Sequence, residues 1–132
     1  MTLTGPQKIP FADHGRWYGN TYPGSAMEVN VGLLHTTEGT NLDSYQGGAV
    51  APNITGVPNF ATQKINWYQH FDVDRSSRAL VNSAGGVETN TLNVFQIELV
   101  GTCDPSTHNK WVNQGITHVY WPWASCRGAP HL

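Results

Sequence analysis

The sequence predicts a single α/β domain in which a central β-sheet is joined by short helices and long loops. Residues 29–35 and 94–101 are rich in β-branched and aliphatic side chains, which predicts two buried strands. Fourteen Gly and eight Pro among 132 residues predict long connecting loops and few long amphipathic helices. A chain of this length is normally one domain with a modest core.

Charge and hydropathy exclude several classes of partner. The formal net charge is −2 and no basic run occurs, so we expect no nucleic-acid partner. No stretch approaches the roughly 20 apolar residues of a membrane span, so we expect no membrane partner. The first residues lack the features of a signal peptide, which predicts synthesis in the cytoplasm. Cys103 and Cys126 leave a disulfide, two free thiols or one metal-bound thiolate open.

The first predicted strand ends on a histidine. Residues 1–28 before it combine Pro, Gly and aromatic residues without a regular period, which predicts an irregular arm. Residues 29–35 then end at His35, which is followed by small polar residues and Gly39. A histidine at the end of a buried strand can be a metal ligand, a general base or a hydrogen-bonded polar cap. All three roles remain open for His35.

The next segment is predicted to contain one helix and a loop. Residues 40–45 are predicted to be a short helix, because Thr40 is a good N-cap and two glycines follow at 47–48. A loop that contains Pro52 and Pro58 comes next.

A hairpin and a last strand are predicted further along the chain. Residues 67–74 alternate apolar and polar side chains, which predicts a strand with one wetter face. We expect residues 79–81 to pair with it across a turn at residues 75–77. Residues 116–121 are predicted to form a last strand.

The second apolar strand carries an acidic residue at its centre. A period of two places Phe95, Ile97 and Leu99 on one face, while Gln96 and Glu98 share the other. An ionised carboxylate costs several kcal/mol to bury unpaired. Glu98 is therefore expected to face a polar cleft, a cation or a proton partner. The alternative is an edge strand whose polar face is solvated.

Three segments in this order resemble the type 2 N-acetylmuramoyl-L-alanine amidases, zinc enzymes related to the peptidoglycan recognition proteins. The segments are residues 33–37 around His35, residues 68–75 around His70, and Ile97-Glu98-Leu99. The match spans roughly residues 27–104 and is most similar to the amidase domains of actinobacteriophage endolysins. The resemblance implies a mostly mixed central sheet of the amidase type.

The resemblance also implies a reaction. These hydrolases cleave the amide bond between N-acetylmuramic acid and L-alanine in peptidoglycan. His35 matches their first zinc ligand, and Glu98 is expected to be catalytic, taking a proton from the zinc-bound water. His70 and Tyr68 are expected to contact the substrate. Relatives often have tyrosine directly before the histidine, where this chain has Gln69.

The remaining zinc ligands leave two alternatives. The family supplies a second histidine, then Cys or Asp eight to ten positions later, after a long helix. His118 and Cys126 are eight residues apart, but only 16 residues separate Gly101 from His118, too few for that helix. Either this pair completes the site, or residues 29–122 form an incomplete amidase-like domain followed by a tail at 123–132. His108 and His131 are interpreted as surface residues, as is His14.

We therefore expect a monomer that acts on the bacterial cell wall as a phage-type lysis protein, with peptidoglycan as its partner and zinc as its cofactor. Two other functions remain open. A non-catalytic peptidoglycan-binding module would need no metal. An unrelated structural domain would have His35 hydrogen-bonded and Glu98 solvated.

Overall fold

The computed structural model describes residues 7–80 and 94–101. These residues form four strands and one 3₁₀ turn, and no α-helix is found among them. In chain order the elements are β1 (Val31–Thr36), the turn η1 (Tyr45–Gly48), β2 (Ile54–Asn59), β3 (Lys64–Gln69) and β4 (Val94–Leu99).

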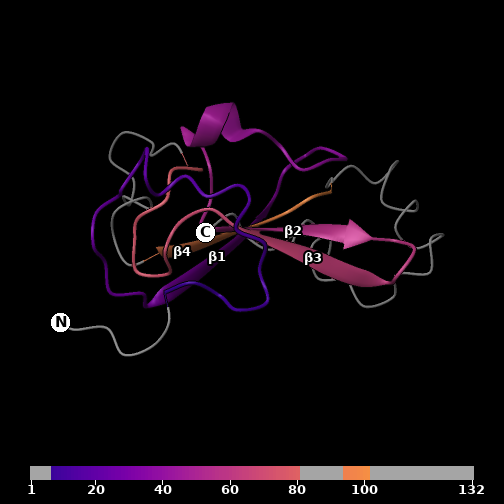
Figure 1. Ribbon diagram of the computed structural model, residues 1–132, viewed down its shortest axis with the longest axis horizontal. Coiled ribbons are helices and arrows are strands. Elements are labelled where there is room, and N and C mark those ends of the chain that lie inside the picture. The colour runs from indigo at the N-terminus through magenta and orange to yellow at the C-terminus, as the bar shows by residue number, and fades with distance from the viewer. Residues whose placement is uncertain (1–6, 81–93, 102–132) are drawn as a thin grey trace, which may run out of the picture.

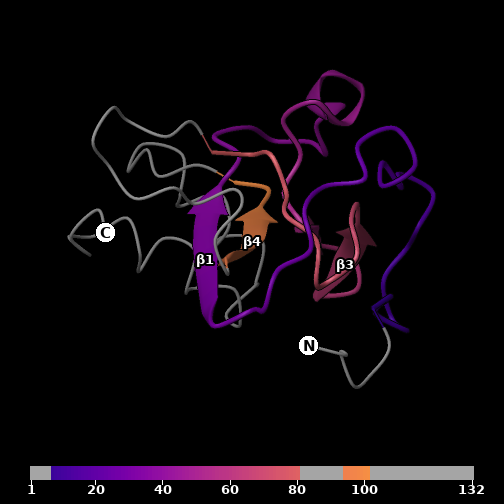
Figure 2. The ribbon, with the colours of Figure 1, turned by 90° about the vertical axis from the view of Figure 1, so that its left-hand side faces the viewer.

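The four strands form one mixed sheet with the order β1-β4-β2-β3. β4 runs parallel to both of its neighbours, and Figure 2 shows it beside β1 and pointing the same way. β2 and β3 form an antiparallel hairpin next to this parallel part of the sheet (Figure 1). The predicted central mixed sheet is confirmed for the described residues.

The two strands predicted most directly are present as β1 and β4. β4 occupies an interior position of the sheet, although it is the last described strand in the sequence. Its more buried face is the polar one, because Gln96 and Glu98 are buried while Phe95 and Ile97 are only partly covered. The period of two was therefore predicted correctly, but the polar side chains are on the inner side.

The predicted hairpin is wrong in its partner. β3 pairs with β2 and not with residues 79–81, of which 79 and 80 lie outside any strand. The segment predicted as a loop forms β2, even though it contains Pro58. β2 pairs with β4 only as far as Gly56, so Pro58 has a neighbouring strand on one side only. Sheet edges of this kind tolerate proline.

The predicted helix at residues 40–45 does not form. Tyr45 begins a short 3₁₀ turn instead, and its backbone N–H is bonded to the carboxylate of Asp43 at 3.2 Å. Gln46 and Gly47 then adopt positive φ angles of 52° and 69°, which end any helical progression. Side chains of Asp compete in this way with helical hydrogen bonds. Figure 1 shows the turn standing apart from the sheet.

The described part of the N-terminal arm, residues 7–28, contains isolated bridges but no strand or helix. Gln69 at the end of β3 holds this arm with its side-chain amide. Its Oε1 accepts the N–H of Ile9 at 2.6 Å, and its Nε2 donates to the carbonyl of Gln7 at 2.8 Å. A bridge between Asp13 and Tyr68 adds a second attachment.

A small aromatic core lies where the arm, the turn and the end of β3 meet. Its buried members are Tyr45, Ala51 and Phe71, and three partly buried residues pack against them, namely Tyr18, Tyr22 and Leu42.

None of the described segments is a helix long and apolar enough to cross a bilayer. The predicted strand at 116–121 and tail at 123–132 lie outside the described residues.

Candidate functional site

One row across the sheet contains three of the four residues predicted to act in a site. His35 on β1 pairs with Glu98 on β4, Glu98 pairs with Thr55 on β2, and Thr55 pairs with Tyr68 on β3. Paired residues project from the same face of a sheet. The register therefore places His35, Glu98 and Tyr68 on one face with Thr55 among them. Tyr68 is partly exposed there.

Glu98 is buried in the interior strand β4, and each of its carboxylate oxygens has a polar partner. Its Oε1 lies 3.2 Å from Nδ1 of His35, and its Oε2 accepts the hydroxyl of Tyr45 at 2.7 Å. The side chain is only 10 % exposed, so the solvated-edge alternative is wrong. Burial raises the pKa of Glu98 to about 7, and Asp43 adds to the rise while the Tyr45 hydrogen bond opposes it.

His35 presents one bonded and one unbonded nitrogen. Burial lowers the pKa of His35 to about 4, so the ring is neutral at pH 7 and its contact with Glu98 is a hydrogen bond donated by Nδ1–H. Its Nε2 is buried and has no hydrogen-bond partner within the part of the chain that the structure describes. A buried ring nitrogen with a free lone pair fits a metal ligand, and a carboxylate on the other nitrogen is the usual support of such a ligand.

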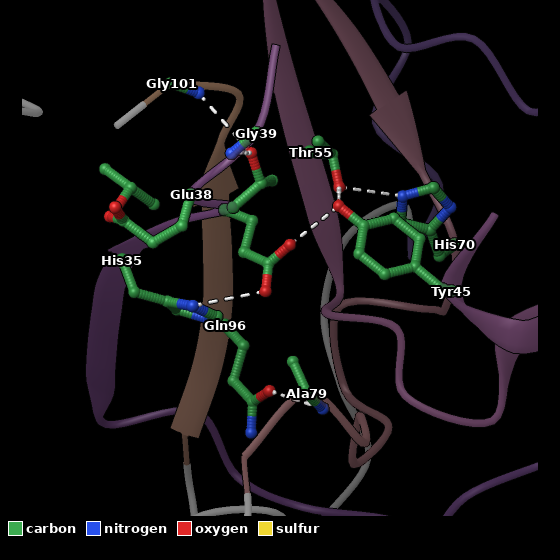
Figure 3. Close-up of polar contacts among 12 residues, drawn as sticks. His35, Glu38, Gly39, Tyr45, Thr55, His70, Ala79, Gln96 and Gly101 are labelled. Atoms are coloured by element: carbon green, nitrogen blue, oxygen red, sulfur yellow. Dashed lines mark hydrogen bonds and ion pairs between the residues drawn. The ribbon is translucent and has the colours of Figure 1, made fainter. Parts of the chain in front are cut away.

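The hydrogen bonds continue beyond Glu98 into the protein. The Tyr45 hydroxyl lies 2.8 Å from Oγ1 of Thr55, and this oxygen lies 2.9 Å from Nε2 of His70 (Figure 3). Nδ1 of His70 is 2.9 Å from the carbonyl oxygen of Arg16. These contacts join three loop or turn segments and three strands into one chain of five hydrogen bonds that runs from Arg16 to His35.

The number of available protons limits which groups in this hydrogen-bond chain can donate. The carbonyl oxygen of Arg16 can only accept, so His70 donates from Nδ1 and, when neutral, accepts at Nε2 from Thr55. With Glu98 ionised, the two hydroxyls and two neutral rings supply four protons for five hydrogen bonds. A proton on Glu98 Oε2 would supply the fifth, and the Tyr45 hydroxyl would then accept from Oε2 and donate to Thr55.

His70 is enclosed by the protein. Its ring is fully buried, with Tyr18 stacked on it at 5.4 Å and Tyr45 against it edge-on at 5.2 Å between ring centroids. Burial lowers its pKa to about 4, which keeps the ring neutral at pH 7. Both ring nitrogens form hydrogen bonds inside the protein, Nε2 with Thr55 and Nδ1 with the carbonyl oxygen of Arg16. Substrate contact by His70 stays a prediction, and this placement gives it no support.

The predicted zinc site is not complete within the described residues. No group of three His, Cys, Asp or Glu side chains within residues 7–80 and 94–101 could hold a metal ion. Nε2 of His35 fits one ligand position, and Glu98 fits the residue that orients it. His118 and Cys126 lie outside the described residues, as does Cys103, so their predicted roles stay predictions.

Sequence reasoning missed two residues that contact the predicted ones. Tyr45 was assigned to a helix and Thr55 to a loop, and neither has a local pattern that indicates a site. Only the register of β2 beside β4, and the turn that brings Tyr45 over the sheet, place their hydroxyls beside Glu98. The mid-strand Glu98 could have suggested that a hydroxyl partner exists, but not which one.

Comparisons of this chain with protein-family models, curated proteins and solved structures found no match.

Proposed function

We propose that this protein is a zinc-dependent N-acetylmuramoyl-L-alanine amidase with a fold of the peptidoglycan recognition protein type. One observation carries the proposal: His35 has its Nδ1 held by the Glu98 carboxyl group and its Nε2 buried without a partner among the described residues. The position of Tyr68 in the same row supports a substrate-facing side of the sheet. The three segments that resemble the amidases supply the reaction.

His35 and Glu98 would have separate roles in amide hydrolysis. Zinc bound at Nε2 of His35 and at further ligands would polarise the substrate carbonyl and lower the pKa of a water molecule. In its ionised form, Glu98 would take one proton from that water, directly or through one bridging water, as the oxygen of the attacking water bonds to the carbonyl carbon. The bond between this carbon and the L-alanine nitrogen would then break, and Glu98 would return the proton to the leaving amine. The products are a lactyl carboxylate and a stem peptide with a free amino group.

Peptidoglycan would be the partner, and Tyr68 would contact the glycan or the stem peptide from the sheet face. The protein would act as a monomer on the cell wall after synthesis in the cytoplasm, as a phage-type lysis protein does.

The test combines zinc content with release of amino groups from purified peptidoglycan. We expect near-stoichiometric zinc and newly exposed alanine amino groups for the parent chain. His35→Ala should lose most of the zinc and the activity. Glu98→Gln, assayed at saturating zinc, should lower kcat by about 100-fold or more, because a general base is removed. His14→Ala and Glu28→Gln are the matched controls outside the row and should behave like the parent.

Other outcomes separate the alternatives. A parent chain that holds zinc but releases no amino groups contradicts the amidase assignment. A chain without zinc that still sediments with peptidoglycan would be the non-catalytic binding module. A chain that does neither would be a structural or interaction domain.

A further inference from the structure

The hydrogen-bond chain behind Glu98 has a fixed direction, because it ends on a group that cannot donate. The Arg16 carbonyl oxygen accepts from Nδ1 of His70, so the neutral His70 ring offers a lone pair at Nε2. The Thr55 hydroxyl is the donor within reach of this nitrogen, at 2.9 Å. The ring cannot turn to another partner easily, since Tyr18 and Tyr45 pack against it.

The hydroxyl groups of Thr55 and Tyr45 connect His70 to the carboxyl group of Glu98. Tyr45 lies 2.8 Å from Thr55 Oγ1 and 2.7 Å from Oε2 of Glu98, and all three side chains are buried. Each contact fixes the next side chain, because a buried polar atom that loses its partner is costly. Oε2 of Glu98 is thereby held toward Tyr45, and this leaves Oε1 facing Nδ1 of His35.

The position of Glu98 determines which ring nitrogen of His35 carries the proton. When Glu98 is ionised, or is protonated on Oε2, its Oε1 is an acceptor for Nδ1–H of His35. That bond selects the ring tautomer with its proton on Nδ1 and leaves the lone pair on Nε2. The other tautomer would place a hydrogen on Nε2 and block it as a ligand.

We propose that Tyr45, Thr55 and His70 are positioning residues that hold Glu98 against His35 and so keep Nε2 of His35 open for a metal ion. The metal part rests on the proposed function. The tautomer part does not, because it follows from the hydrogen bonds alone.

The tautomer test uses metal-free protein labelled with ¹⁵N in its histidine rings. Long-range ¹H–¹⁵N spectra at pH 8 report which ring nitrogen carries the proton. We expect His35 and His70 of the parent chain to be protonated on Nδ1. Thr55→Val and Tyr45→Phe should shift His35 toward a mixture of tautomers, although Thr55 does not touch His35. Thr55→Ser keeps the hydroxyl and should restore the parent spectrum. Tyr22→Phe is the matched control for the tyrosine change.

A second measurement gives the metal affinity directly, by competition with a coloured zinc chelator. Thr55→Val and Tyr45→Phe should weaken zinc binding by about tenfold, within the range found for residues that orient metal ligands. Thr55→Ser and Tyr22→Phe should stay within about twofold of the parent.

Two results would overturn the proposal. One is a parent His35 protonated on Nε2, and the other is a His35 tautomer unchanged in both hydroxyl-deleting variants. Failure of the proposed function looks different. A parent chain that binds no zinc, with tautomers that still respond to Thr55→Val and not to Thr55→Ser, removes the metal but leaves the positioning role in place.

Discussion

Asn53 joins three segments through its side-chain amide. Its Oδ1 accepts the N–H of Gln96 at 2.9 Å, and its Nδ2 donates to the carbonyl of Arg75 at 2.8 Å. The residue is fully buried, so water does not compete for these groups. Its own carbonyl accepts the N–H of His70 at 2.9 Å, which links it to the enclosed ring.

Removing this amide should destabilise the fold. Asn53→Ala would remove the acceptor of the Gln96 N–H and the donor to the Arg75 carbonyl, which costs about 2–4 kcal/mol of unfolding free energy. Urea denaturation of metal-free protein gives the value. Asn66→Ala, the same change at an exposed position of β3, should stay within about 0.5 kcal/mol of the parent. Equal effects at the two positions would show that the buried amide contributes little.

Single residues were predicted best where they contradict their surroundings. A glutamate at the centre of an apolar strand requires a partner, and the structure provides two, His35 and Tyr45. Tyr45 could not be predicted, because a tyrosine before two glycines is equally suited to a surface turn. His70 was singled out from the sequence, but its burial depends on Tyr18, which belongs to the distant N-terminal arm.

β2 and β4 pack closely at one glycine. A Cβ on Gly56 would come within 2.8 Å of a Leu99 methyl and 2.9 Å of the Trp67 ring, both in neighbouring strands. Real Cβ atoms do not make such contacts, so these two side chains occupy the space that Gly56 leaves.

Gly56→Ala should therefore lower the unfolding free energy, by about 1–3 kcal/mol, because it overpacks an ordered interface. Gly32→Ala is the matched control within β1, where a Cβ would meet nothing within 4 Å. Thermal melts of both variants give the comparison, and Gly32→Ala should be neutral or slightly stabilising. A loss of stability in Gly32→Ala equal to that in Gly56→Ala would contradict the packing argument.

At the scale of elements, hydrophobic runs were a good guide and turn chemistry was a poor one. β1 and β4 follow from apolar residues alone. β2 was missed because a proline such as Pro58 usually indicates a loop. The strand tolerates Pro58 because this residue lies beyond the part of β2 that pairs with β4. The helix at 40–45 was wrong because the Asp43 side chain and the glycines favour a tight turn. Pairing partners depend on contacts far apart in sequence, which local patterns do not contain.

The stability of the whole molecule should fall in acid. Burial lowers the pKa of His70 from 6.5 to about 4, so below pH 6.5 the unfolded chain takes up a proton that the folded chain does not. The gap corresponds to roughly 3 kcal/mol, which is present above pH 6.5 and lost as the pH falls toward 4. His35 acts in the same direction. Glu98 acts in the opposite one, since its contribution is present below pH 4.5 and lost as the pH rises through about 7.

Urea unfolding of metal-free protein at pH 7 and pH 4 tests this balance. The difference in unfolding free energy between the parent and His70→Gln should shrink by roughly 3 kcal/mol at the lower pH. Glu98→Gln removes the opposing contribution, so its stability should fall more steeply than that of the parent between pH 7 and pH 4.5. A parent-to-His70→Gln difference that is the same at both pH values would show that His70 can be charged in the folded protein.

The place of β4 sets the order in which the chain can assemble. It is made after β1, β2 and β3, yet it lies between β1 and β2 and joins them. On the ribosome, the β2–β3 hairpin can form as soon as it emerges, because its strands are close in sequence. Among the described strands, β1 has only β4 as a neighbour, so it must wait until residues 94–99 have been synthesised. His35 and Glu98 therefore meet only when β4, the last of the described strands to be synthesised, joins β1, and until then the apolar residues of β1 must be kept from other contacts.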